Sequence, residues 1–301
     1  MGKGISTIFD LNIGTEKVLG TIYFSDPDFI DTGNTFVNNF SISRNNYPNA
    51  GFENREVKNV STLKYEIFDK MSFEHGVEFS HDKVSVNNDS TSIIKDQEGE
   101  YLTTKYLYGL NLDNRDKKFK TSFGHTVGFF QGIAIPPSDI PYISNNLYGS
   151  LYHQFAEEFQ ATIRYKIRSA NSLNEDPIKL SNRIFLSDSE MRGFANRGIG
   201  PKINNDFIGG NYAYVTNFST TFPNGLPDSW NSTSNLFFDV GNVWGSDIDT
   251  INNFNKIRSS VGIGFTWSSP LGPIGVSYSE PLSKLSSDKV ENFNFRIGSI
   301  F

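Results

Sequence analysis

ENFNFRIGSIF, the stretch from Glu291 to Phe301, alternates apolar and polar residues. Phe293, Phe295, Ile297 and Phe301 share one parity, and Asn292, Asn294 and Arg296 take the other. A two-residue period is typical of an extended strand. The segments Val261 to Trp267 and Ile274 to Tyr278 repeat it, with mainly Gly, Ser and Thr on the polar parity. A polar face of small residues suits the inside of a wide barrel whose outer face contacts lipid. The alternative is a soluble all-β domain with a buried apolar face.

The composition of the chain narrows the possible fold classes and partners further. The chain has 301 residues with a hydrophobic fraction of 37%, a net charge of -6 and no cysteine. It contains no run of about 18 apolar residues that would predict a membrane-spanning helix. Its 27 Phe and 13 Tyr are the rings expected of two aromatic belts at membrane interfaces. The negative charge argues against a nucleic-acid partner. Met1 leads into a strand pattern without the apolar core of a secretory signal, so an exported protein would lack its front here.

The whole chain is expected to form one domain, residues 1–301, because no Pro-, Ser- or Gly-rich linker divides it. Counting alternating segments gives about fourteen strands, an even number that fits a transmembrane antiparallel up-and-down β-barrel. Short turns are expected near residues 69, 115 and 157. Longer polar loops are expected near residues 50, 90 and 140, the first running from Arg44 to Lys58. The segment Phe159 to Ser169 carries Arg164, Lys166 and Arg168 on its polar face, which would line a wet lumen.

The longest connection, from Ala170 to Ile208, is too long to be idle in a compact fold. Its centre reads Met191, Arg192, Gly193 and Phe194, followed by Gly198, Ile199, Gly200 and Pro201. These residues resemble the VRGF tip and the following GIGP of loop six in the BamA family of outer-membrane assembly factors, with Met in place of Val.

Three further motifs extend the resemblance in the same order. FFDVGNVW at 237–244 resembles the family's FFxDxGxxW strand, and SPLGP at 269–273 resembles a family turn. The terminal strand from Glu291 to Phe301 ends in an aromatic residue, as in the family. Four ordered motifs over about 110 residues are specific, whereas a lone Arg-Gly-Phe would mean nothing.

The resemblance implies a barrel of roughly sixteen strands with an arm that folds back into the lumen. This chain would begin at the third strand, without the periplasmic POTRA domains and the first two strands. In the family the arm's Arg bonds acidic residues of the wall, which carries over to Arg192 and Asp239. Parity agrees, because Leu236 and Phe238 belong to the lipid-facing set and leave Asp239 inward. The second acidic partner falls on Ser219, so that bond is not expected.

The implied function is insertion of nascent outer-membrane β-barrel proteins through a lateral seam at the terminal strand, with Phe293, Phe295, Ile297 and Phe301. The implied setting is the bacterial outer membrane. The partners would be its lipid, the nascent barrels and accessory lipoproteins bound through the missing periplasmic domains.

No covalent chemistry, cofactor or metal is expected. The four histidines, His75, His81, His125 and His153, are isolated and lack metal-ligand spacing. The alternatives are a two-partner secretion or translocation-assembly barrel of the same build, a passive porin, and a soluble β-domain.

Overall fold

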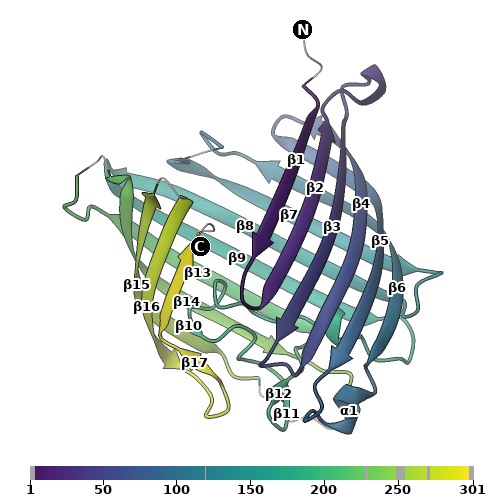
Figure 1. The fold of residues 1–301 in the computed structure, drawn as a ribbon. Coiled ribbons are helices and arrows are strands. Elements are labelled where there is room, and N and C mark those ends of the chain that lie inside the picture. Colours follow the sequence, from purple (N-terminus) through teal and green to yellow (C-terminus); the bar gives the residue numbers. More distant parts are fainter. Residues whose placement is uncertain (1–3, 119, 228–229, 249–254, 270–271, 298–301) are drawn as a thin grey trace.

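A computed structural model of the chain describes residues 4–118, 120–227, 230–248, 255–269 and 272–297. Its main feature is a 14-stranded antiparallel sheet that curves round into an open barrel (Figure 1). Its strands, in spatial order, are β1 (Ser6–Ile13), β2 (Lys17–Asp26), β3 (Thr35–Tyr47), β4 (Phe52–Phe68), β5 (Met71–Val86), β6 (Gly99–Asp113), β7 (Phe123–Ile135), β8 (Tyr142–Ala156), β9 (Phe159–Ser172), β13 (Tyr212–Phe222), β14 (Ser232–Trp244), β15 (Arg258–Ser269), β16 (Gly272–Ser283) and β18 (Phe293–Ile297).

The order confirms the predicted antiparallel up-and-down architecture, because neighbours in sequence are neighbours in the sheet. The sheet is not closed. Strands β1 and β18 form its two edges, and among the described residues they do not pair with each other. Short helices are η1 (Phe29–Asp31), α1 (Ser92–Lys95) and η2 (Leu180–Asn182). Within the described ranges, no helix has the length and apolar character needed to cross a membrane.

The apolar rows face outward. On β14, Leu236 and Phe238 are 55% and 38% exposed, while Asp239, which directly follows Phe238, is 0% exposed. Ile263 on β15 and Phe293 on β18 are likewise exposed. A soluble sandwich would bury these rows between two sheets. The exposed rows instead have the polarity expected of a wall that contacts lipid outside and water inside.

Two predicted connections were wrong in length. The polar loop expected from Arg44 to Lys58 is a short turn at residues 48–51, because β3 and β4 continue through it. The turn expected near residue 115 is instead the longer connection 114–122. At the first place, polar residues on both parities hid the limits of the strands; at the second, the strand limits were predicted correctly and the connection was taken to be shorter than it is.

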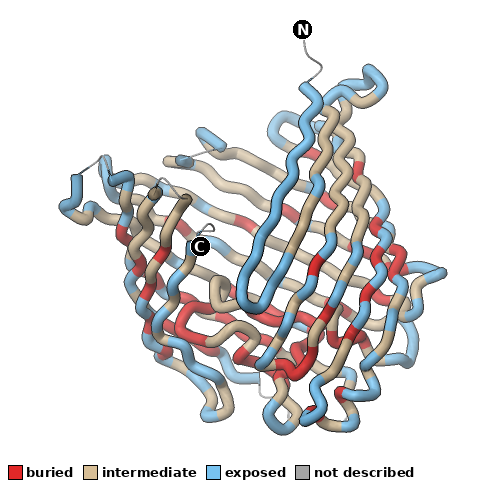
Figure 2. The backbone as a smooth tube through the Cα atoms, in the orientation of Figure 1, coloured by how far each residue is buried: buried red, intermediate tan, exposed pale blue. Residues whose placement is uncertain are grey.

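The buried apolar core lies inside the barrel, where the segment between β9 and β13 crosses the lumen (Figure 2). One cluster packs this segment against β13 and β14 and includes Met191, Phe194 and Val243. A second packs it against β4, β5 and α1 and includes Phe52, Val84 and Ile94. The segment therefore joins two separate parts of the wall.

Candidate functional site

The candidate site is the segment 173–211, called the arm below. It contains η2 and three two-residue strands: β10 (Gly193–Phe194), β11 (Lys202–Ile203) and β12 (Asp206–Phe207). Strands β11 and β12 pair with each other, which folds the arm back on itself. The predicted inward-folding loop is therefore present, and most of the residues singled out in it are buried.

Arg192 at the arm's centre meets Asp239 on β14. Its Nε lies 2.8 Å from Oδ2 and its Nη2 lies 2.7 Å from Oδ1, so the pair is bidentate. The backbone N–H of Arg192 also donates to Oδ2 at 3.2 Å. The guanidinium stacks on the ring of Phe237, 3.5 Å from its centroid. Arg192 is 6% exposed and Asp239 is 0% exposed, so the pair is shielded from water and salt.

The second wall contact comes from Asn217 on β13, two residues from the Ser219 considered in the sequence. In the sheet register Asn217 lies opposite Asp239, and Ser219 lies opposite Phe237. Asn217 Nδ2 donates to Asp239 Oδ1 at 2.9 Å and to the backbone oxygen of Glu190 at 2.8 Å. A neutral amide thus bridges the wall carboxylate and the arm.

Glu190 is a second ionic anchor, which the sequence reading missed. It lies 2.7 Å from Lys166 Nζ and 3.0 Å from Arg168 Nη2, both on β9. These are two of the three cations predicted to line the lumen. Burial favours the neutral acid, but Arg168 and Lys166 outweigh it and hold the pKa of Glu190 below its ordinary value. The cations on β9 therefore hold the arm as well as lining the lumen.

The arm also holds the last strand. Asp188 forms an ion pair with Arg296 and accepts a hydrogen bond from Asn294 Nδ2 at 2.6 Å. Both partners lie on the inner face of β18. Just before that strand, β10 of the arm pairs with β17 (Val290–Glu291) in an antiparallel register. Backbone bonds from Ala195 to Lys289 and from Lys289 to Gly198 extend this pairing.

The other motif residues shape the arm. Gly193 and Gly200 have φ of +91° and +114°, a region that favours glycine. A Cβ at Gly200 would lie 3.0 Å from Val243 of the wall, so the backbone approaches closely there. Pro201 is buried and its carbonyl accepts a hydrogen bond from Ile208.

The terminal-strand residues lie outside the barrel. Phe293, Phe295 and Ile297 are 58%, 56% and 61% exposed. Phe301, Pro270 and Leu271 are outside the described residues. Strand β18 pairs with β16 from Ile274 to Tyr278, and in the described part of the chain its other edge has no partner strand.

The described residues contain no group of three or more His, Cys, Asp or Glu that could hold a metal ion. The arrangement offers fixed ion pairs and a free strand edge. Such an arrangement can hold one chain segment in place through its ion pairs and can pair with the backbone of another strand at its edge.

Comparison with known proteins gives a family and a fold. The sequence profile of the Omp85 superfamily domain matches residues 1–301. "Outer membrane protein assembly factor BamA" of Neorickettsia risticii is 28% identical over 269 residues, covering 87% of this chain and 36% of that protein. The protein of the same name from Neisseria meningitidis is 25% identical over 228 residues, covering 65% of this chain and 28% of that protein. The chain spans about a third of the length of these relatives.

Two solved structures share the fold. The crystal structure of BamA from Haemophilus ducreyi lacking POTRA domains 1-3 matches with a TM-score of 0.83 at 19% identity, covering 97% of this chain and 64% of that one. CdiB from Acinetobacter baumannii matches with a TM-score of 0.55 at 12% identity, covering 96% of this chain and 57% of that one.

Proposed function

This chain belongs to the Omp85 superfamily, and we propose on that premise that it is the barrel part of an outer-membrane protein assembly factor. It would lie in the bacterial outer membrane and help nascent β-barrel proteins to insert there. The names of its curated relatives support this role. The work would be non-covalent, and the clients would be recognised through their backbones.

The one-sided pairing of β18 carries the proposal. A strand edge in lipid exposes N–H and C=O groups that cost several kcal/mol each when they stay unpaired. An incoming strand satisfies them by adding to the sheet. In the described residues, five register pairs, Ile274–Ile297 to Tyr278–Phe293, join β18 to β16, and its other edge has no partner strand there.

The arm would hold this edge in position. It is fixed to β14 through Arg192 and Asp239 and to β9 through Glu190. It reaches β18 through Asp188, so it acts as a brace between the continuous wall and the free edge. The brace contacts the inner face of β18, which leaves the outer face and the edge open to lipid and client.

The test uses the full chain reconstituted in lipid vesicles and an unfolded small outer-membrane barrel as the client. We expect the client to fold faster in vesicles that contain the chain than in empty vesicles. Folding is measured as the growth of a client band whose gel migration changes on heating. Because the chain has no cysteine, Phe295→Cys supplies a unique cross-linking site at the seam. It should cross-link to a cysteine in the client's terminal strand.

The matched control is Ile263→Cys, a lipid-facing position on β15, which is paired on both sides. Equal cross-linking at both positions, or equal folding rates with and without the chain, would reject the proposal. A client that is recovered soluble across the membrane, without a heat-modifiable band, would favour the alternative of a secretion or translocation barrel.

A further inference from the structure

The outer wall carries a row of cations near the arm end of the barrel. Arg44 on β3 lies directly opposite Arg55 on β4, and Arg55 lies directly opposite Lys83 on β5. Like charges placed opposite each other across strands are destabilising. Lys83 has Glu100 directly opposite it on β6, whereas Arg44 and Arg55 face each other with no acid directly opposite either of them.

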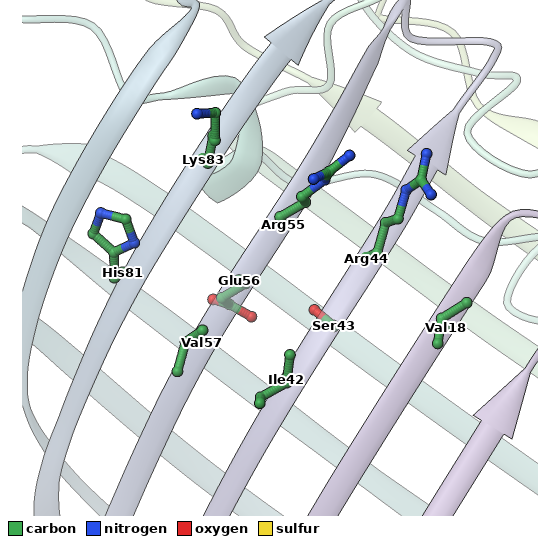
Figure 3. A pocket seen from close by; sticks show the side chains of 9 residues that line it. All are labelled: Val18, Ile42, Ser43, Arg44, Arg55, Glu56, Val57, His81 and Lys83. Carbon is green, nitrogen blue, oxygen red and sulfur yellow. The ribbon is translucent and has the colours of Figure 1, made fainter.

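Apolar residues form the floor beside this row. Ile42 and Val57 lie one pleat from the arginines on the same outer face, and they are 53% and 43% exposed. With Val18 and the cations they line a cavity of about 470 Å³. Figure 3 shows Arg44, Arg55 and Lys83 gathered toward one end of this cavity and Ile42 and Val57 toward the other. The three cations therefore lie at one end of the cavity, and the other end is lined by the apolar residues together with Ser43, Glu56 and His81.

Glu53 fixes the two guanidiniums without using all their donors. Its carboxylate lies 2.7 Å from Arg44 Nη2 and 2.8 Å from Arg55 Nε. The arginine side chains are 60% and 61% exposed, against 19% for Glu53, so the acid lies beneath the cations. A guanidinium has five N–H donors, so each arginine has donors beyond the one that bonds Glu53. Such an oriented pair is suited to phosphate.

The cation row keeps a net positive charge after its ion pairs are counted. Lys83 forms an ion pair with Glu100 at 2.9 Å, and His81 lies 3.5 Å from the same carboxylate. Glu56, which also lines the cavity, pairs with Lys58 at 2.9 Å. Arg44, Arg55 and Lys83 face the two carboxylates of Glu53 and Glu100, so the group keeps a net charge of +1 before any protonation of His81.

We propose that this surface binds the phosphate headgroup of an anionic membrane lipid. Arg44 and Arg55 would contact the phosphate, and Ile42 and Val57 would contact the start of the acyl chains. A lipid matches both ends of the cavity, whereas a free phosphate ion would use only the cationic end. The site lies on the outer face of β2 to β5, whereas the proposed client seam is at β18, so the two are separate.

The test places a fluorophore beside the cavity. Gly20 lies opposite Ile42 in the register, and a Cβ there would meet nothing within 4 Å. Gly20→Cys in the cysteine-free chain therefore gives a single label at small structural cost. In vesicles of equal phosphatidylglycerol and phosphatidylcholine, brominated phosphatidylglycerol should quench the label more strongly than brominated phosphatidylcholine.

Substituting Arg44→Gln and Arg55→Gln should lower this lipid preference by about fivefold per arginine, the factor typical of one cation at an anionic leaflet. Lys117→Gln with Lys118→Gln removes the same charge from the connection 114–122 and should leave the preference unchanged. Heat-modifiable migration checks that each variant is folded.

Equal quenching by the two lipids, or a preference that survives the double arginine substitution, would overturn the assignment. Displacement of phosphatidylglycerol by inorganic phosphate at equal concentration would show a simple anion site and would also overturn it. Client folding is measured separately, so failure here is distinguishable from failure of the proposed assembly function.

Discussion

Replacing Asp239 by Asn tests whether the arm depends on its buried ion pair. The substitution keeps the size of the side chain but leaves the Arg192 guanidinium enclosed and without a counter-charge. Asp239 accepts bonds from Arg192 Nε, Nη2 and backbone N–H and from Asn217, and an amide with one oxygen cannot accept them all. Breaking one partner of a buried pair costs about 3–5 kcal/mol. A loss of about 4 kcal/mol would raise the undocked fraction of the arm nearly a thousandfold.

The assay follows the exposure of Met191, which is 1% exposed when the arm is docked. In a Met191→Cys chain, the rate of maleimide labelling reports the undocked fraction when docking is faster than labelling. Asp239→Asn should raise this rate by two to three orders of magnitude, the range that corresponds to about 3–4 kcal/mol. Adding Arg192→Gln should restore part of the protection, because the orphaned charge is then gone.

The control breaks a different buried pair. Glu78 and Lys105 lie 2.7 Å apart on β5 and β6, with side chains 11% and 14% exposed. Glu78→Gln should lower the heat-unfolding midpoint and leave labelling at Met191→Cys slow. An unchanged labelling rate in Asp239→Asn, or strictly additive effects of the Arg192 and Asp239 substitutions, would refute the role of the pair.

Three further predictions follow from the arm. Asp188→Asn should speed amide exchange in β18 about tenfold by loosening Arg296; unchanged protection of the terminal peptide would contradict the brace. The pKa of Glu190 in the folded protein is lowered from its ordinary value of 4.5, so its stabilisation is present above that value and is lost as pH falls through the folded-state pKa. Pepsin should therefore cut the arm faster at lower pH in the wild type, with a flatter profile in Glu190→Gln. Lys179 Nζ lies 4.0 Å from the centroid of the Tyr101 ring, and burial lowers the pKa of Lys179 to about 8. Because burying this cation is costly, Lys179→Met should raise the heat-unfolding midpoint, and a lower midpoint would count against this account.

The sequence was sufficient to predict which side chains face inward wherever apolar and polar residues alternate strictly. The parity of Leu236 and Phe238 placed Asp239 inward, and the structure brings Asp239 to Arg192. Near the rim, strands leave the lipid and need no apolar face, so the ends of β3 and β4 were mistaken for a loop. The Glu190 and Asp188 contacts depend on the path of a long arm. Asp188 lies 106 residues from Asn294, and no local pattern encodes a contact at that separation.

The pairing of β10 with β17 has a consequence for the order of folding. Gly193 meets Glu291 and Phe194 meets Val290, so this ladder cannot form until nearly the whole chain has been made. Contacts so distant in sequence carry a large loop-closure entropy and form late. A chain cut short before residue 289 would lack this ladder and the Asp188–Arg296 ion pair, while the contacts of Arg192 and Glu190 with β14 and β9 could still form.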